Sequence, residues 1–132
     1  MRSIVIDDTM KQQTSANDEP HLLHEFFERQ VRLRPDSPAV EFNDEVLTYS
    51  QLDQLADRVA AFLRARGVIP GSLVALYLEK SCRLYAAMLG VLKAGAGYVP
   101  LDPKFPTARV LSILEDADVT IIARQLVAGG MA

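Results

Sequence analysis

Apolar residues recur at helical spacing along much of the chain. Residues 21–34 carry an apolar stripe at intervals of three and four, which predicts an amphipathic helix that ends at Pro35. The members of this stripe are Leu23, Phe26, Phe27 and Val31. Residues 51–64 repeat the pattern, and Gly67 predicts the end of that second helix. Its apolar face comprises Leu52, Leu55, Ala56, Val59, Phe62 and Leu63.

Two later helices differ in how much of their surface is apolar. Residues 82–94 are apolar around most of the circumference, so we expect this helix to be deeply packed. Its large apolar residues are Leu84, Tyr85, Met88, Leu89, Val91 and Leu92. After Pro106, which suits the first position of a helix, the sequence predicts another helix with a narrower apolar face. That face comprises Val110, Leu111 and Leu114.

Short β-prone runs alternate with these helices. Residues 38–42 and 46–48 flank an Asn-Asp turn and predict a small β-hairpin. Residues 73–78 are continuously apolar, which predicts a strand covered on both faces, as in a parallel sheet. Further strands are expected at residues 98–99 and 119–122. The order from residue 73 onward is therefore β-α-β-α-β, half of a doubly wound, mostly parallel sheet of the α/β class.

The same pattern divides the chain into three parts. Residues 1–20 are polar and mixed in charge, which predicts a flexible leader. Residues 21–124 contain all the predicted elements and form the expected folded domain. Residues 125–132 predict a frayed tail, because no turn or element follows from their sequence.

Composition excludes few functions. A chain of 132 residues is long enough for one domain or part of one, and its net charge of −3 gives no basic surface for nucleic acid or anionic membrane. The apolar runs are too short to span a bilayer, and the first residues lack a secretory signal. Cys82 is the single cysteine, so no internal disulfide can form. We therefore expect a cytoplasmic protein.

Polar residues mark the starts of two helices. Thr48 and Gln51 have the spacing of a capping box, in which each side chain bonds the other residue's backbone amide. Ser50 and Asp53 offer a second register, so the sequence leaves the start of this helix open by two residues. Ser81 is the expected N-cap of the helix over residues 82–94.

The segment after residue 94 has the chemistry of a tight corner. Gly95 can adopt the left-handed conformation at a helix end, and Pro100 is expected to end the strand ladder because it has no amide hydrogen. Asp102 can accept hydrogen bonds from nearby backbone amides, and we expect Arg109 to donate to this corner. A less favoured alternative is that Asp102 is an acid, a base or a magnesium ligand, since α/β sites gather at the carboxyl ends of parallel strands.

Other candidates for chemistry have simpler interpretations. Asp7 and Asp8 could bind a metal, but adjacent carboxylates in a polar leader are more often solvated. His21 and His24 have a spacing that can place two imidazoles on one helix face, yet no further ligand completes a metal site. Cys82 lies in a first helical turn, where the helix dipole can activate a thiol, but no motif supports a reactive role.

Two segments resemble motifs of one enzyme family. LTYSQL (residues 47–52) and LKAGAGYVPLD (residues 92–102) resemble consecutive motifs of nonribosomal peptide synthetase adenylation domains, in the acyl-adenylate-forming or AMP-binding superfamily. Residues 21–124 therefore resemble a partial adenylation domain, the first part of its large N-terminal lobe. Fold chemistry accounts for the motif residues as structural positions. These are Leu47, Thr48, Tyr49, Leu52, Leu92, Lys93, Ala94, Gly95, Tyr98, Pro100 and Asp102.

The resemblance implies an activity that this chain is not expected to perform alone. The family uses ATP and magnesium to convert an amino acid to its aminoacyl adenylate, and then loads a carrier protein. The family's phosphate loop, substrate pocket and lid domain with its catalytic lysine have no counterpart in this sequence. We therefore expect a truncated adenylation domain, with no catalytic, cofactor-binding or metal-binding residue in this chain. The implied partners are a carrier protein and the remaining synthetase domains.

A second hypothesis is a stand-alone, non-catalytic interaction module. Such a module would bind a synthetase or occupy the interface between its domains. An incomplete sheet would leave unpaired strand edges, which predicts self-association as a further property.

Overall fold

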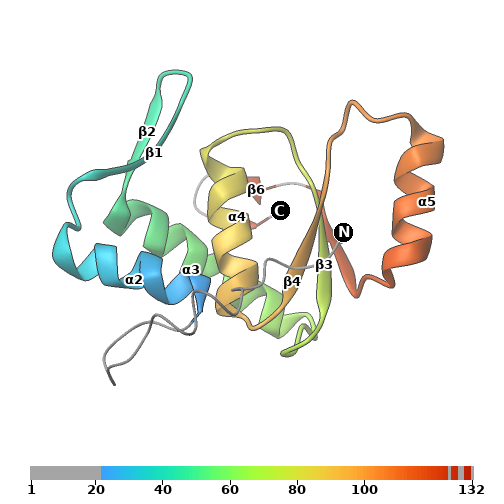
Figure 1. Ribbon diagram of the computed structural model, residues 1–132, viewed down its shortest axis with the longest axis horizontal. Coiled ribbons are helices and arrows are strands. Elements are labelled where there is room, and N and C mark those ends of the chain that lie inside the picture. The colour runs from blue at the N-terminus through green and yellow to red at the C-terminus, as the bar shows by residue number, and fades with distance from the viewer. Residues whose placement is uncertain (1–21, 125, 128–129, 132) are drawn as a thin grey trace, which may run out of the picture.

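A parallel sheet lies between helices in the part of the chain that the structure describes (Figure 1). The computed structural model describes residues 22–124, 126–127 and 130–131. The helices are α2 (Leu23–Leu33), α3 (Tyr49–Ala65), α4 (Cys82–Lys93) and α5 (Thr107–Ala117). The strands are β1 (Pro38–Phe42), β2 (Glu45–Thr48), β3 (Leu73–Tyr77), β4 (Gly97–Leu101), β5 (Ile121–Ala123), β6 (Leu126–Val127) and β7 (Gly130–Met131).

The sheet has the predicted β-α-β-α-β connectivity. Strand β3 is central in the order β4-β3-β5, and both of its neighbours run parallel to it. Leu73 pairs with Gly97, and Val74 pairs with both Tyr98 and Ile121. The predicted α/β class, with a small hairpin and a parallel sheet, is confirmed.

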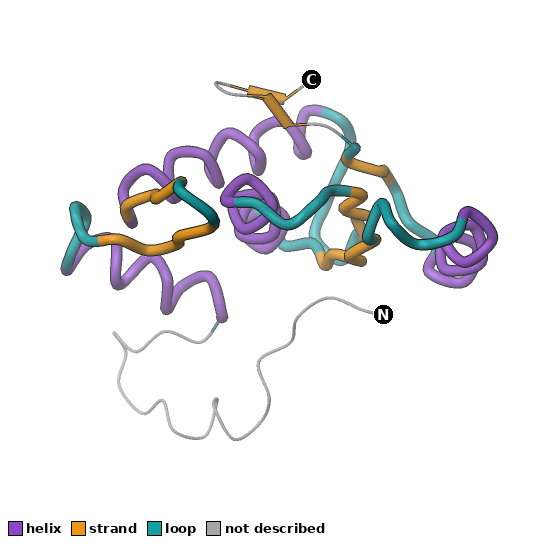
Figure 2. The backbone as a smooth tube through the Cα atoms, turned by 90° about the horizontal axis from the view of Figure 1, so that it is seen from above, coloured by secondary structure: helices purple, strands orange, loops and turns teal. Residues whose placement is uncertain are grey.

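Helices cover β3 from both sides, as the continuous apolar run predicted (Figure 2). Val74 and Leu76 belong to the core shared with α3 and α4. Ala75 belongs to a second cluster, which Tyr77 and α5 complete on the opposite face. Alternate residues of β3 therefore serve two cores, which is why polar residues do not interrupt its sequence.

The apolar face of α5 differs from the prediction by one residue. Val110 and Leu114 pack against the sheet as expected, and Ile113 and Ala117 join them. Leu111, predicted to belong to this face, is 53% exposed. It lies one position from Val110, which turns it about 100° away around the helix axis.

The closest helix contact is between α3 and α4, where small residues face each other. A Cβ atom on Gly90 would lie 2.5 Å from Cβ of Val59 and 2.8 Å from the carbonyl oxygen of Ala56. The expectation of a deeply packed α4 holds on this face. It is wrong for Tyr85, which is 39% exposed, because the small side chains rather than the large ones face α3.

The hairpin and α2 lie on the side of α4 that faces away from the sheet (Figure 1). Strands β1 and β2 pair antiparallel, and Asn43 adopts φ 56° in the turn, as the Asn-Asp signal predicted. Helix α2 ends just before Pro35, and the ring of Phe27 lies 5.9 Å from that of Tyr49 on α3.

Some element ends differ from the sequence predictions. Pro100 lies within β4, paired with Leu76, instead of ending the ladder; β4 is an edge strand, where a missing amide is tolerated. Pro106 is the N-cap of α5 and not its first residue. Strands β6 and β7 pair in the range 125–132, where we expected no element; each has two residues, too few to show a periodic signal. The predicted leader, residues 1–20, lies outside the described residues.

Candidate functional site

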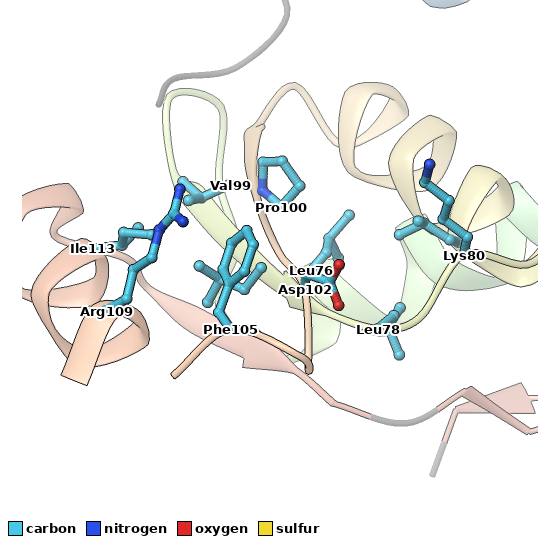
Figure 3. A pocket seen from close by; sticks show the side chains of 11 residues that line it. Leu76, Leu78, Lys80, Val99, Pro100, Asp102, Phe105, Arg109 and Ile113 are labelled. Atoms are coloured by element: carbon cyan, nitrogen blue, oxygen red, sulfur yellow. The ribbon is translucent and has the colours of Figure 1, made fainter. Parts of the chain in front are cut away.

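The carboxyl ends of β3 and β4 open into a cavity of about 300 Å³ (Figure 3). Open α/β sheets bind their ligands at this edge. Most of the lining is apolar and comes from the strand ends and the inner face of α5. The lining residues are Leu76, Leu78, Lys80, Leu84, Val99, Pro100, Leu101, Asp102, Phe105, Arg109 and Ile113.

Asp102 forms the corner that closes one side of this cavity. Its carboxylate accepts a hydrogen bond from the backbone N–H of Lys104 at 2.9 Å, which confirms the predicted turn chemistry. Its own carbonyl oxygen accepts from the N–H of Phe105 at 2.9 Å. The expected hydrogen bond from Arg109 does not form, because the Arg109 guanidinium lies over the Phe105 ring, 4.3 Å from the centroid.

The charged groups around the cavity are at its rim and face solvent. Lys80, Asp102 and Arg109 are exposed residues. Within residues 22–124 and the two short strands that follow, no group of three or more His, Cys, Asp or Glu residues is placed to hold a metal ion. The cavity is therefore suited to apolar packing or binding, with charge only at its edge.

Of the leader carboxylates and the two histidines considered as metal ligands, His24 lies within the described residues. His24 is half-buried on α2, whereas His21, Asp7 and Asp8 lie outside the described residues. The described carboxylates that do converge, on α2 and α3, bind a lysine.

Cys82 is fully buried, and its surroundings disfavour the nucleophilic thiolate form. Burial raises the pKa of its thiol, and the neighbouring Glu45 raises it further. Its Sγ donates to the backbone carbonyl oxygen of Glu45 at 3.6 Å. A thiol kept protonated in this way packs α4 against the hairpin, which favours the non-reactive interpretation.

The first motif builds the junction between β2 and α3. The hydroxyl of Thr48 accepts from the N–H of Gln51 at 3.1 Å, and the Gln51 side chain accepts from the N–H of Thr48 at 2.9 Å. This confirms the capping box and removes the alternative register at Ser50. Leu52 is buried, and Tyr49 contacts the ring of Phe27.

The second motif carries the chain from α4 into β4. Gly95 adopts φ +79°, as predicted for the helix end, and its carbonyl oxygen accepts from the N–H of Gly71 at 3.0 Å. A Cβ at Gly95 would lie 3.3 Å from Pro70, so the backbones approach closely here. Tyr98 is buried, and burial raises the pKa of its phenol. Leu92 and Ala94 are also buried in the core.

Lys93 of the same motif has partners that sequence reasoning missed. Its ammonium contacts the carboxylates of Asp53 at 2.6 Å, Asp57 at 2.7 Å and Glu28 at 3.1 Å. Burial alone would lower the pKa of Lys93, but these hydrogen bonds outweigh it and raise the pKa above its ordinary value. Asp53 and Asp57 are four residues apart on one face of α3. Like charges at that spacing repel, so this pair of aspartates in the sequence could have indicated that a cation lies opposite them.

The fold defines a class: an α/β lobe with a parallel sheet and a cavity at the carboxyl ends of its strands. A profile described as AMP-binding enzyme matches residues 27–129. Tyrocidine synthase 3 of Brevibacillus parabrevis is 45% identical over 103 residues, and bacitracin synthase 1 of Bacillus licheniformis is 45% identical over 100. These alignments cover 78% and 76% of this chain, but 2% of each synthase.

Solved structures agree with the sequence relatives. The AMPPNP-bound form of the nonribosomal peptide synthetase FmoA3 matches with a TM-score of 0.74 and 39% identity, over 86% of this chain and 12% of that one. The N-terminal subdomain of Klebsiella oxytoca NpsA matches with a TM-score of 0.73 and 28% identity. This match covers 82% of the present chain and 28% of the NpsA chain. The chain belongs to the AMP-binding enzyme family and corresponds to an N-terminal portion of a nonribosomal peptide synthetase adenylation domain.

Proposed function

We propose that this chain supplies the first part of a domain that activates an amino acid. In the complete domain, the amino acid carboxylate attacks the α-phosphate of ATP, forming an aminoacyl adenylate and releasing pyrophosphate. Magnesium accompanies the ATP. The adenylate then passes its acyl group to the thiol of a carrier protein, which is the partner we propose together with the other synthetase domains.

One observation carries this proposal: both motif segments lie within residues 27–129, which match the AMP-binding enzyme profile, and the fold matches a solved synthetase structure with a TM-score of 0.74. The match to FmoA3 spans 86% of this chain and 12% of the solved one, so the chemistry would draw on many residues beyond this segment. The comparisons do not favour the stand-alone interaction module.

Segment replacement tests the proposal. Residues 22–124 of this chain replace the equivalent residues in the adenylation domain of a tyrocidine synthase 3 module, and amino-acid-dependent exchange of pyrophosphate into ATP is measured. We expect the chimera to retain exchange with the amino acid preference of the recipient. A chimera that folds and binds ATP but shows no exchange would contradict the proposal.

The purified 132-residue chain is the matched comparison. We propose that it shows no exchange above background with any amino acid, and that exchange depends on the rest of the domain. Robust exchange by this chain alone would contradict that part of the account.

Among the described residues, no helix is long and apolar enough to cross a membrane. We propose that the activity takes place in the cytoplasm.

A further inference from the structure

The Lys93 cluster joins three helices at one ammonium group. Lys93 is on the last turn of α4, Asp53 and Asp57 are on α3, and Glu28 is on α2. The Lys93 side chain is 8% exposed, while those of Asp53, Glu28 and Asp57 are 24%, 37% and 61% exposed. The lysine is thus the buried centre, and the carboxylates form its outer side.

This cluster has more negative than positive charge. Each of the three carboxylates lies within hydrogen-bond distance of the same nitrogen, which brings them within the roughly 4–6 Å over which like charges disfavour each other. The positive charge of Lys93 attracts all three carboxylates, and so makes the net interaction within the cluster attractive. Without it, Glu28 on α2 would face Asp53 and Asp57 on α3 across a repulsive contact.

Helix α2 is packed against α3 and α4 through half-buried side chains. The structure describes every residue from 23 to 33, and none of them is fully buried. Leu23 packs against the edge of the core, and Phe27 contacts Tyr49. The chain after α2 is tied to the start of α3, where the N–H of Ser50 donates to the carbonyl oxygen of Pro35 at 2.9 Å.

We propose that Lys93 is a latch that holds α2 against α3 and α4. Removing its charge turns the contact between α2 and α3 from attraction to repulsion, so that α2 detaches while the core of α3, α4 and the sheet stays folded. The latch gives the motif lysine a role in how the fold is assembled, separate from amino acid activation.

Hydrogen exchange of the 132-residue chain tests this proposal through a change of sign. In the wild type, Glu28→Gln removes an attractive contact, and we expect faster exchange of the α2 amides. In a Lys93→Met background the same Glu28→Gln change removes a repulsive contact, and we expect slower α2 exchange than in Lys93→Met alone. Glu79→Gln, an exposed carboxylate outside the cluster, is the matched control and should leave α2 unchanged.

Lys93→Met should speed α2 exchange about tenfold or more, and should lower the Tm by roughly 5 °C or more because it leaves carboxylates without their cation. Two outcomes would overturn the proposal: Glu28→Gln speeds α2 exchange in both backgrounds, or it speeds α2 exchange in neither. If Lys93→Met does not fold, the single Glu28→Gln variant decides: unchanged α2 exchange overturns the proposal, and faster exchange confined to α2 supports it.

Discussion

At the scale of single residues, Gly90 sets how closely α4 approaches α3. The hypothetical Cβ at 2.5 Å from Val59 is closer than real carbon contacts, so the helices must move apart for any side chain. We predict that Gly90→Ala destabilises the chain by about 1–2 kcal/mol: an overpacking cost of about 2–3 kcal/mol, offset by the roughly 1 kcal/mol that alanine gains in helix propensity. Urea unfolding measures this, and Val59→Ala should cost less in the Gly90→Ala background than in the wild type. Gly90→Ala with wild-type stability would contradict the packing.

The ionisation of Lys93 predicts a particular pH dependence. Because the folded chain raises the pKa of Lys93 above its unfolded value of about 10.4, the lysine's stabilisation is complete below that pH. It is lost as the pH rises through the higher folded-state pKa. The difference in Tm between wild type and Lys93→Met should therefore stay constant from neutral pH to about pH 10, and shrink above it. A difference that shrinks between pH 7 and 9 would contradict this.

Residue-scale sequence reasoning succeeded where the chemistry is local. The Thr48–Gln51 box, the Ser81 cap and the left-handed Gly95 all depend on residues within a few positions of each other. It failed at Lys93, whose partners are 36 to 65 positions away in sequence. A contact of that kind depends on how the helices pack: the spacing of Asp53 and Asp57 indicated that a cation lies opposite them, but not which one.

At the scale of elements, the two faces of the sheet account for most of the architecture. The apolar run of β3 was sufficient to predict burial on both of its faces. The alternation of strands and helices predicted that the strands of the sheet run parallel. The orientation of α5 was harder to predict, since Leu111 and Ile113 are equally apolar. Only packing on the sheet decides between them, and it places Ile113 inward. The cavity at the strand ends was likewise not predictable beyond its edge of the sheet.

The two residues offer a matched pair for testing the orientation of α5. We predict that Ile113→Ala destabilises the chain by about 1–3 kcal/mol, because it removes methyl groups from the cluster around Ala75 and Val99. Leu111→Ala, at a 53% exposed position, should change stability by less than about 0.5 kcal/mol. Both values come from urea unfolding of the 132-residue chain. Equal effects at the two positions would mean that α5 does not pack on this face.

At the scale of the whole molecule, the described fold matches a small part of much longer proteins. It spans 28% of the solved NpsA N-terminal subdomain and 2% of the tyrocidine synthase 3 chain. The two family motifs support the helix junctions and the strand corner, and the rim charges beside the cavity remain exposed. We propose that the chain contributes scaffold to the adenylation domain and that the reacting groups come from other segments.

The most direct test of this account is the exchange rate of the chimeric adenylation domain that carries residues 22–124 of this chain. We predict amino-acid-dependent pyrophosphate exchange within about tenfold of the recipient domain, a difference of roughly 1.4 kcal/mol in activation free energy. A chimera that is folded and binds ATP, yet exchanges no pyrophosphate above background, would contradict the claim that this chain is the first part of an amino-acid-activating domain.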